Sequence, residues 1–215
     1  HLIKKKLNSK NFRSKIIKVD TKKGDSFFKD IKNEYFLTET NKENLSFIFE
    51  ISKRLKLKNN LLLKTINKFK GLKYRQQIIL KKKNLIVIND SKSTSFASSI
   101  GILKNYQNIY WIIGGIHKKG DKLNLPKKYF KKIKAFVFGK DKKFFNNELK
   151  GKIVYENFTN LEFAFKKIIR LIKKDRSPKR TILFSPSAAS FDSFKNFEER
   201  GLYFNKLSKK YLNGI

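Results

Sequence analysis

Residues 109–120 read IYWIIGGIHKKG. The first five residues are all apolar and have the length of a short strand, and the two glycines after them mark a tight turn. A strand without polar residues is buried on both faces, which is typical of a parallel sheet covered by helices on each side. This stretch therefore predicts a central strand of a parallel sheet, with a basic turn at its carboxyl end.

Similar apolar runs alternate with helical patterns from about residue 73 to the C-terminus. The expected strands are Arg75–Lys81, Asn84–Ile88, Ile109–Ile113, Ala135–Phe138, Lys152–Val154 and Thr181–Phe184. The expected helices are Phe96–Leu103, a segment after Pro126, Lys142–Leu149, Leu161–Ile172 and Phe194–Leu207. Repeated strand–helix units of this kind predict an α/β fold, a Rossmann-like domain with a mostly parallel sheet.

The part of the chain before residue 73 has a different pattern. Apolar residues recur at helical spacing from Asn41 onward, and a second helix is expected over Leu61–Phe69. Gly71 follows this helix, and a glycine is a common helix terminator. We therefore expect a domain boundary there, with residues 1–72 belonging to one domain and residues 73–215 to another.

The composition excludes several classes of function. The chain has no Cys and two His, so disulfides, thiol chemistry and a His-based metal site are not expected. No apolar run approaches the ~18–20 residues that a membrane span needs, so no membrane association is expected.

The net charge of +35 would fit a nucleic-acid-binding module. Lys is spread through every segment, however, beside Asn, Ile and Phe, as an A/T-rich genome would also produce, so the charge does not make nucleic-acid binding the favoured function.

Three expected strands end in polar sequences, and the carboxyl ends of parallel strands form the usual ligand-binding edge. These polar ends are residues 89–94 (NDSKST), 114–120 (GGIHKKG) and 185–192 (SPSAASFD). Each has a structural alternative: Asp90, Ser91, Thr94 or Asp192 could cap a helix, and Lys118 could be one more solvated lysine. Together they offer cations, hydroxyls and helix N-termini, which suit an anionic ligand.

At these motifs the sequence resembles the Mur ligases, and within them the ligases that add D-glutamate. The resemblance rests on Asn41-x-x-Asn44, FKGLKYR at 69–75, NDSKST at 89–94 and SPSAASFDSFKNFEERG at 185–201, and a weaker Gly114-Gly115-x-x-Lys118 turn agrees with it. It implies that residues 1–72 are the end of an α/β ATPase domain and that residues 73–215 are the C-terminal domain. The chain begins at His1 and lacks a phosphate loop, so we expect the missing parts of the family's architecture to precede it.

The resemblance also implies roles for individual residues. Asn41 and Asn44 would contact adenine, and Arg75, Asp90 and Lys92 would hold the ribose and phosphates. Thr94 and Lys118 would bind the α-carboxylate of D-glutamate, and Ser190 and the backbone N–H of Phe197 its side-chain carboxylate. Where the family usually has His, this chain has Thr40 and Tyr74. Glu198, Glu199 and Arg200 are expected to form pairs on a helix surface.

The implied activity is the ATP-dependent joining of D-glutamate to UDP-N-acetylmuramoyl-L-alanine in peptidoglycan precursor synthesis. Its cofactors would be ATP and Mg²⁺, with the metal ligands outside this chain. We expect a cytoplasmic monomer that is inactive by itself, because a cradle for the β- and γ-phosphates is missing. Another ligase of the same superfamily, such as a folylpolyglutamate synthase, is the alternative enzyme, and the run at 185–201 argues against it.

Overall fold

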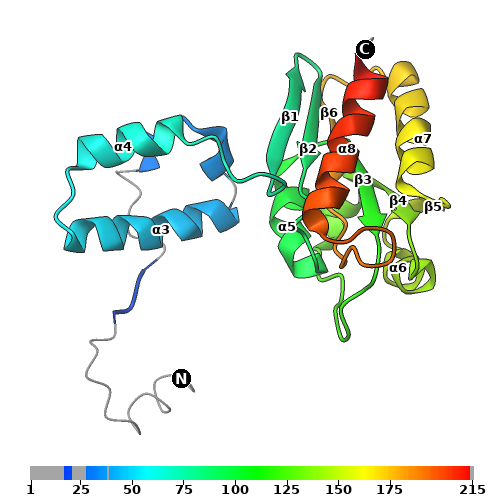
Figure 1. Cartoon of the computed structure of the whole chain (residues 1–215), viewed down its shortest axis with the longest axis horizontal. Coiled ribbons are helices and arrows are strands. Elements are labelled where there is room, and N and C mark those ends of the chain that lie inside the picture. Colours follow the sequence, from blue (N-terminus) through cyan, green and yellow to red (C-terminus); the bar gives the residue numbers. More distant parts are fainter. Residues whose placement is uncertain (1–16, 21–27, 38, 214–215) are drawn as a thin grey trace, which may run out of the picture. The chain divides into compact units, whose positions relative to one another are not determined.

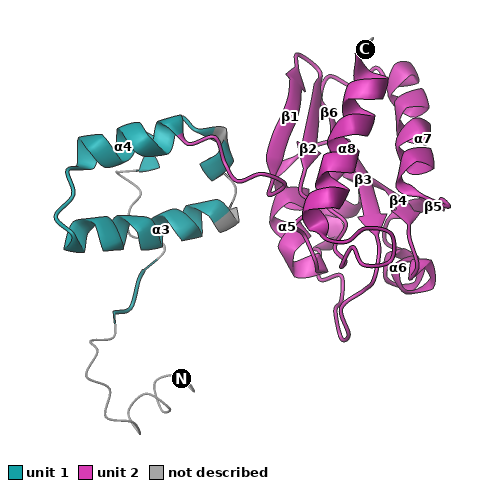
Figure 2. Ribbon diagram, viewed as in Figure 1, with its two compact units in different colours: residues 1–68 teal, residues 69–215 magenta. Residues whose placement is uncertain are grey.

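The computed structural model describes residues 17–20, 28–37 and 39–213. The chain divides into two compact units, residues 1–68 and residues 69–215 (Figure 2). The predicted boundary, after residue 72, lies a few residues further along the chain. No helix among the described residues is long and apolar enough to cross a membrane.

Unit 1 is helical wherever it has regular structure among its described residues. It contains the 3-10 helix η1 (Glu34–Leu37) and the helices α3 (Glu39–Arg54) and α4 (Asn59–Lys68). Its small core is formed by Ile31, Phe36, Leu45 and Ile66. Several large apolar side chains of α3, α4 and their connection are exposed, namely Phe47, Ile48, Ile51, Leu55, Leu57 and Leu61. The sequence pattern therefore predicted the helices correctly, but this unit buries only part of their apolar residues.

Unit 2 is built on a six-stranded sheet with the strand order β1-β2-β6-β3-β4-β5 (Figure 1). The strands are β1 (Gln77–Lys82), β2 (Leu85–Asn89), β3 (Ile109–Gly114), β4 (Ile133–Phe138), β5 (Val154–Asn157) and β6 (Arg180–Phe184). β1 pairs with β2 antiparallel, and every other neighbouring pair is parallel. All six residues of β3 are buried, as a central strand requires. The predicted α/β fold with a mostly parallel sheet is confirmed.

Helices cover both faces of this sheet. One face packs against α7 (Leu161–Lys174) and α8 (Phe197–Leu212), and the other against α5 (Phe96–Asn105) and α6 (Lys142–Leu149). Successive side chains of β3 point to opposite faces of the sheet and so contribute to a hydrophobic core on each face. Tyr110 and Ile112 lie in the core with α7 and α8, and Trp111 and Ile113 lie in the core with α5 and α6. The sheet is thus buried on both sides, and its strand ends remain for polar groups.

Three predicted elements differ most from the structure, and the bounds of others shift by one or two residues. The segment after Pro126 is a 3-10 helix, η2 (Lys127–Lys132), and β5 begins at Val154, where the predicted strand ended. α8 begins at Phe197, three residues later than the Phe194 that was predicted. The reason for this last difference is local: Phe194 N donates to Ser190 O in a turn at 2.9 Å, and Asn196 caps the helix through a bond from Glu199 N at 2.8 Å.

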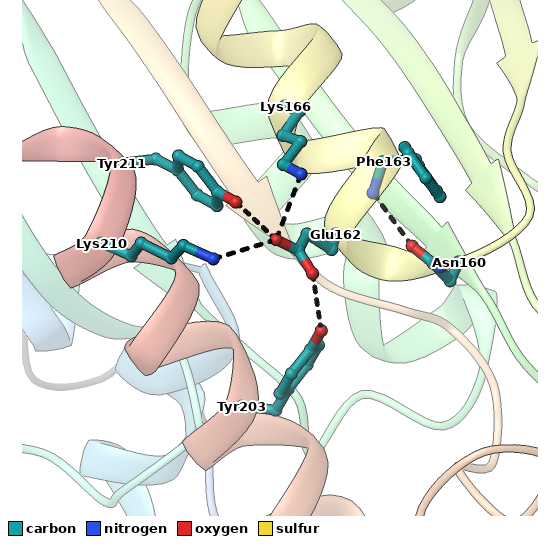
Figure 3. A network of polar contacts seen from close by, with 7 residues as sticks. All are labelled: Asn160, Glu162, Phe163, Lys166, Tyr203, Lys210 and Tyr211. Atoms are coloured by element: carbon teal, nitrogen blue, oxygen red, sulfur yellow. Dashed lines mark hydrogen bonds and ion pairs between the residues drawn. The ribbon is translucent and has the colours of Figure 1, made fainter.

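A carboxylate fastens α8 to α7 (Figure 3). Glu162, in the first turn of α7, accepts hydrogen bonds from the hydroxyls of Tyr203 and Tyr211 on α8. It also pairs with Lys210 and Lys166, both at 3.4 Å. The hydrogen bond from Tyr211 is the main cause that lowers the pKa of Glu162, and the two lysines lower it further. Partial desolvation acts in the opposite direction but is outweighed, so the pKa of Glu162 falls to about 2.

The Glu162 cluster predicts a loss of stability in acid. Its pKa is depressed in the folded state, so its contribution is fully present above the usual value of 4.5 and is lost as the pH falls toward about 2. We expect Glu162→Gln to lower the free energy of unfolding at pH 6 and to make no difference near pH 2. Urea unfolding of wild type and variant across this range measures it. Glu156→Gln, which removes an exposed partner of Lys167 at 3.0 Å, is the matched control and should change little at any pH.

Candidate functional site

The polar strand ends of β2, β3 and β6 are joined to one another at the carboxyl edge of the sheet. Backbone hydrogen bonds connect them: Asp90 N to Phe184 O, Gly114 N to Pro186 O, Ala188 N to Ser93 O, and a two-way bridge between Ile116 and Ala189. The segments that carry Lys92, Thr94, Lys118 and Ser190 therefore belong to one edge of unit 2.

Two glycines next to these segments lie in close contact with neighbouring residues. Gly114 has φ +136° and lies against the carbonyl of Phe138, where a Cβ atom would overlap the oxygen. Gly201, in α8, lies against the ring of Tyr74, and a Cβ atom would overlap that ring. Only glycine fits either position without moving its neighbour, which explains why the motifs at 114–118 and 185–201 contain glycine there.

Arg200 is the residue that sequence reasoning misjudged. It is fully buried, not part of a helix-surface pair. Its Nε donates to Ser91 Oγ at 3.1 Å, and its Nη2 donates to Ser91 O at 2.7 Å and to Ala188 O at 3.0 Å. Desolvation lowers the pKa of the guanidinium to about 10, against the opposing charges of Asp192 and Asp90. A signal was available, because Arg200 lies in the most specific motif of the chain.

A group of buried serine hydroxyls surrounds Asp90. Ser185 Oγ donates to Asp90 Oδ2 at 2.7 Å, and Ser99 Oγ lies within 2.6–2.7 Å of the hydroxyls of Ser93, Ser185 and Ser187. The other carboxylate oxygen of Asp90 accepts from the backbone N–H of Gln76 at 3.0 Å. Desolvation outweighs these bonds and the charges of Arg75 and Arg200, and it raises the pKa of Asp90 to about 7.

The structure brings together the three residues of unit 2 that were expected to hold the nucleotide. Lys92 N donates to Tyr74 O at 2.9 Å, and the Gln76–Asp90 bond fixes the other side of Arg75. The side chains of Arg75 and Lys92 are exposed, and Lys92 Nζ lies 4.1 Å from the ring centre of Phe197. Asp90 is buried and both its oxygens accept bonds from the protein, so it supports Arg75 in addition to any contact with a ligand.

The predicted D-glutamate residues lie on three of the joined segments. Thr94 and Lys118 are exposed, and Ser190 is buried. Phe197 is the first residue of α8, so its N–H is among the helix N–H groups that have no intrahelical acceptor. The helix-cap alternatives for Thr94 and Asp192 are wrong, because Ser95 caps α5 and Asn196 caps α8.

Asn41 and Asn44 lie in unit 1. Asn41 is buried in α3, and its amide donates to Tyr35 O at 2.6 Å. Asn44, one turn further along α3, is exposed. Asn41 therefore has a structural role within unit 1 in addition to the adenine contact that the motif implies.

Two cavities lie away from the predicted site residues. One, of about 320 Å³, is at the amino ends of β3 and β4 and includes Asn108, Lys134 and Asp175 in its lining. The other, of about 340 Å³, lies between β1 and α8. Among the described residues no group of three or more His, Cys, Asp or Glu could hold a metal ion.

The chain resembles two solved Mur ligases in fold. One is MurF from Acinetobacter baumannii, with a TM-score of 0.58 and 17% identity over 80% of this chain and 38% of that one. The other is the UDP-N-acetylmuramate–alanine ligase MurC from Thermotoga maritima, with a TM-score of 0.53 and 16% identity over 83% of this chain and 39% of that one. At such low identity this likeness establishes the fold alone.

The sequence relatives are more specific. The chain is 39% identical over 172 residues to the UDP-N-acetylmuramoylalanine–D-glutamate ligase of Rickettsia prowazekii, 37% over 171 residues to that of the Wolbachia of Brugia malayi, and 34% over 182 residues to that of Francisella tularensis subsp. novicida. No family model matches the sequence. The chain belongs to the Mur ligase family. It spans 34–43% of the length of these relatives, and 80–83% of the chain is matched.

The raised pKa of Asp90 predicts a pH-dependent stability. Between the usual value of 3.8 and about 7 the unfolded chain loses this proton while the folded chain keeps it, so the free energy of unfolding should fall as the pH rises. Asp90→Asn should remove this part of the slope, because the amide stays neutral. Unfolding of both proteins between pH 4 and pH 8 measures the difference. An unchanged slope in the variant would mean that Asp90 is ionised throughout.

Arg200 predicts a large loss of stability on truncation. Arg200→Met leaves the carbonyls of Ser91 and Ala188 buried without their donor, and we expect the free energy of unfolding to fall by about 2–4 kcal/mol. Arg170→Met, an exposed arginine of α7, should change it by less than about 0.5 kcal/mol. Denaturant unfolding of the two variants compares them, and equal effects would contradict the role of Arg200.

Proposed function

We propose that this chain supplies the D-glutamate site and part of the ATP site of a ligase that joins D-glutamate to UDP-N-acetylmuramoyl-L-alanine. The names of its sequence relatives support this activity. The chain spans less than half of those relatives, so the activity is that of a longer protein or assembly.

The observation that carries the proposal is the position of residues 185–201. This run begins at the carboxyl end of β6, passes beside Ser93 and Ile116, and ends in the first turns of α8, where Arg200 fastens it to Ser91. A helix N-terminus at a sheet's carboxyl edge favours a carboxylate, through free N–H groups and the helix dipole. D-Glutamate carries two carboxylates, and this edge offers two sets of groups for them.

In this proposal each carboxylate has its own partners. Lys118 and Thr94 bind the α-carboxylate, the first by charge and the second through its hydroxyl. Ser190 and the N–H of Phe197 bind the side-chain carboxylate at the start of α8. Two fixed carboxylates orient the amino group between them, which is the main contribution that positioning can make to the reaction.

The residues assigned to the nucleotide follow the motifs of the family. Asn41 and Asn44 are assigned to adenine, and Arg75, Asp90 and Lys92 to the ribose and phosphates. In the proposed reaction the alanyl carboxylate takes the γ-phosphoryl group of ATP, giving an acyl phosphate and ADP. The amine of D-glutamate then attacks the acyl carbon, the C–O bond to phosphate breaks, and the amine gives up a proton as the amide forms. ATP and the UDP-sugar are intracellular metabolites, so we place the reaction in the cytoplasm.

The assignment of Lys118 predicts a binding defect without a loss of fold. We expect D-glutamate to shift the amide resonances of Ser190 and Phe197 in a ¹⁵N-labelled chain, and Lys118→Ala to weaken this binding by about tenfold or more, because a carboxylate loses its charged partner. Lys119→Ala, which removes the next exposed lysine, is the matched control and should bind normally. L-Glutamate and D-alanine test stereochemistry and the need for a second carboxylate. Equal affinity of the two lysine variants would reject the assignment.

A further inference from the structure

The turn that carries Lys118 is held more firmly than an exposed basic loop usually is. Residues 118–120 are exposed, yet the residues on either side of Lys118 are tied to different helices: His117 to the start of α6 and Asp121 to the start of α5. Ile116 is bridged to Ala189, which fixes the entrance of the turn. The residue between that bridge and Lys118 is His117, the only histidine among the described residues.

His117 is held by three contacts with the start of α6. Its backbone N–H donates to Asp141 Oδ2 at 2.9 Å, and its ring Nδ1 lies 2.7 Å from the same oxygen. The ring also stacks on Phe144, with 4.1 Å between ring centres and 20° between planes. Backbone and side chain of one residue thus share a single anchor, which fixes both its position and its rotamer.

The side chain of Asp141 bonds to His117 instead of capping its own helix. It occupies the N-cap position of α6, where an aspartate usually accepts from its helix, but its side chain makes no capping bond. Its backbone N–H donates to Gly115 O at 3.3 Å. Partial burial acts to raise the pKa of Asp141, but the hydrogen bonds from His117 and the nearby positive charges outweigh it and lower that pKa.

The other side of Lys118 is tied to α5. Asp121 N donates to Lys118 O at 3.0 Å, and Asp121 Oδ2 accepts from the backbone N–H of Phe96 at 2.6 Å. Phe96 is the first residue of α5 and lies two residues after Thr94. The two residues assigned to one carboxylate are therefore connected through Asp121.

We propose that His117, anchored by Asp141 and Phe144, is a positioning residue that holds Lys118 ready for the carboxylate of an amino-acid ligand. The inference rests on the proposed function, since it concerns the same carboxylate. His117 acts on affinity because a lysine whose backbone is already ordered loses less conformational entropy on binding. A free turn would have to be ordered by the ligand at each binding event.

The test uses the ¹⁵N-labelled full chain, with D-glutamate as the probe. We expect His117→Ala to weaken D-glutamate binding by about three- to tenfold and to lower the heteronuclear NOE of the Lys118 amide. His117→Asn should restore most of both, because the Asn amide can donate to Asp141 from about the place of Nδ1. Asp141→Ala should match His117→Ala, and the double variant should be no weaker than either single one. Lys122→Ala, an exposed lysine close by, is the control.

The outcomes separate the two proposals. Wild-type affinity in His117→Ala, or no restoration by His117→Asn in a variant whose α7 and α8 resonances are unchanged, overturns the positioning role. If the wild-type chain shows no response to D-glutamate, the proposed function fails instead. In that case an unchanged Lys118 NOE in His117→Ala would overturn the positioning role as well, and a lowered NOE would retain it for another carboxylate ligand.

Discussion

The carboxyl edge of unit 2 depends on one buried cation. Arg200 carries its charge into a site with no exposure, where the transfer of an ion from water is strongly unfavourable unless its donors are satisfied. Three hydrogen bonds to Ser91 and Ala188 offset part of that penalty. The negative charges of Asp90 and Asp192 offset a further part of the penalty. The Nη1 atom of Arg200 has no hydrogen-bond partner within the described chain. These bonds run from α8 to the segments that follow β2 and β6. The position of the guanidinium therefore constrains the backbone of both segments.

The hydrogen bonds of the serine cluster depend on the protonation of Asp90. Each hydroxyl has one proton to donate. When Asp90 is ionised, Ser185 gives its proton to the carboxylate, so Ser99 must donate to Ser185 and accept from Ser93 and Ser187. When Asp90 is protonated it can become the donor, and the direction of this chain of bonds can reverse. The protonation of one carboxyl group thus sets the direction of the hydrogen bonds that join the end of β2, α5 and the end of β6.

Most of the fold of unit 2 could be predicted because its strands are short apolar runs and its helices are amphipathic, both of which depend on local pattern. The errors come from interactions that the spacing of apolar residues does not contain. α8 starts late because Ser190 and Asn196 make competing turn and cap bonds. Arg200 was expected on a surface because acids stand next to it in sequence, whereas its partners are about 110 and 12 residues away. The anchoring of His117 by Asp141 likewise joins residues whose separation, 24 positions, carries no periodic signal.

The positive charge of the chain is therefore not what defines the site. The chain has 52 Lys and Arg residues, so a ligand carboxylate would meet a cation at most places on its surface. An exposed lysine contributes little to binding affinity, however, when the ligand must order it on contact. Two lysines at the carboxyl edge of the sheet differ from these exposed lysines because neighbouring residues restrict their positions. Lys92 lies over the ring of Phe197, and Lys118 follows a histidine that is fixed to α6. In the proposed site, selectivity for a particular carboxylate would come from the few cations whose backbone and neighbours are ordered in advance, and the surrounding excess of lysine would add attraction without direction.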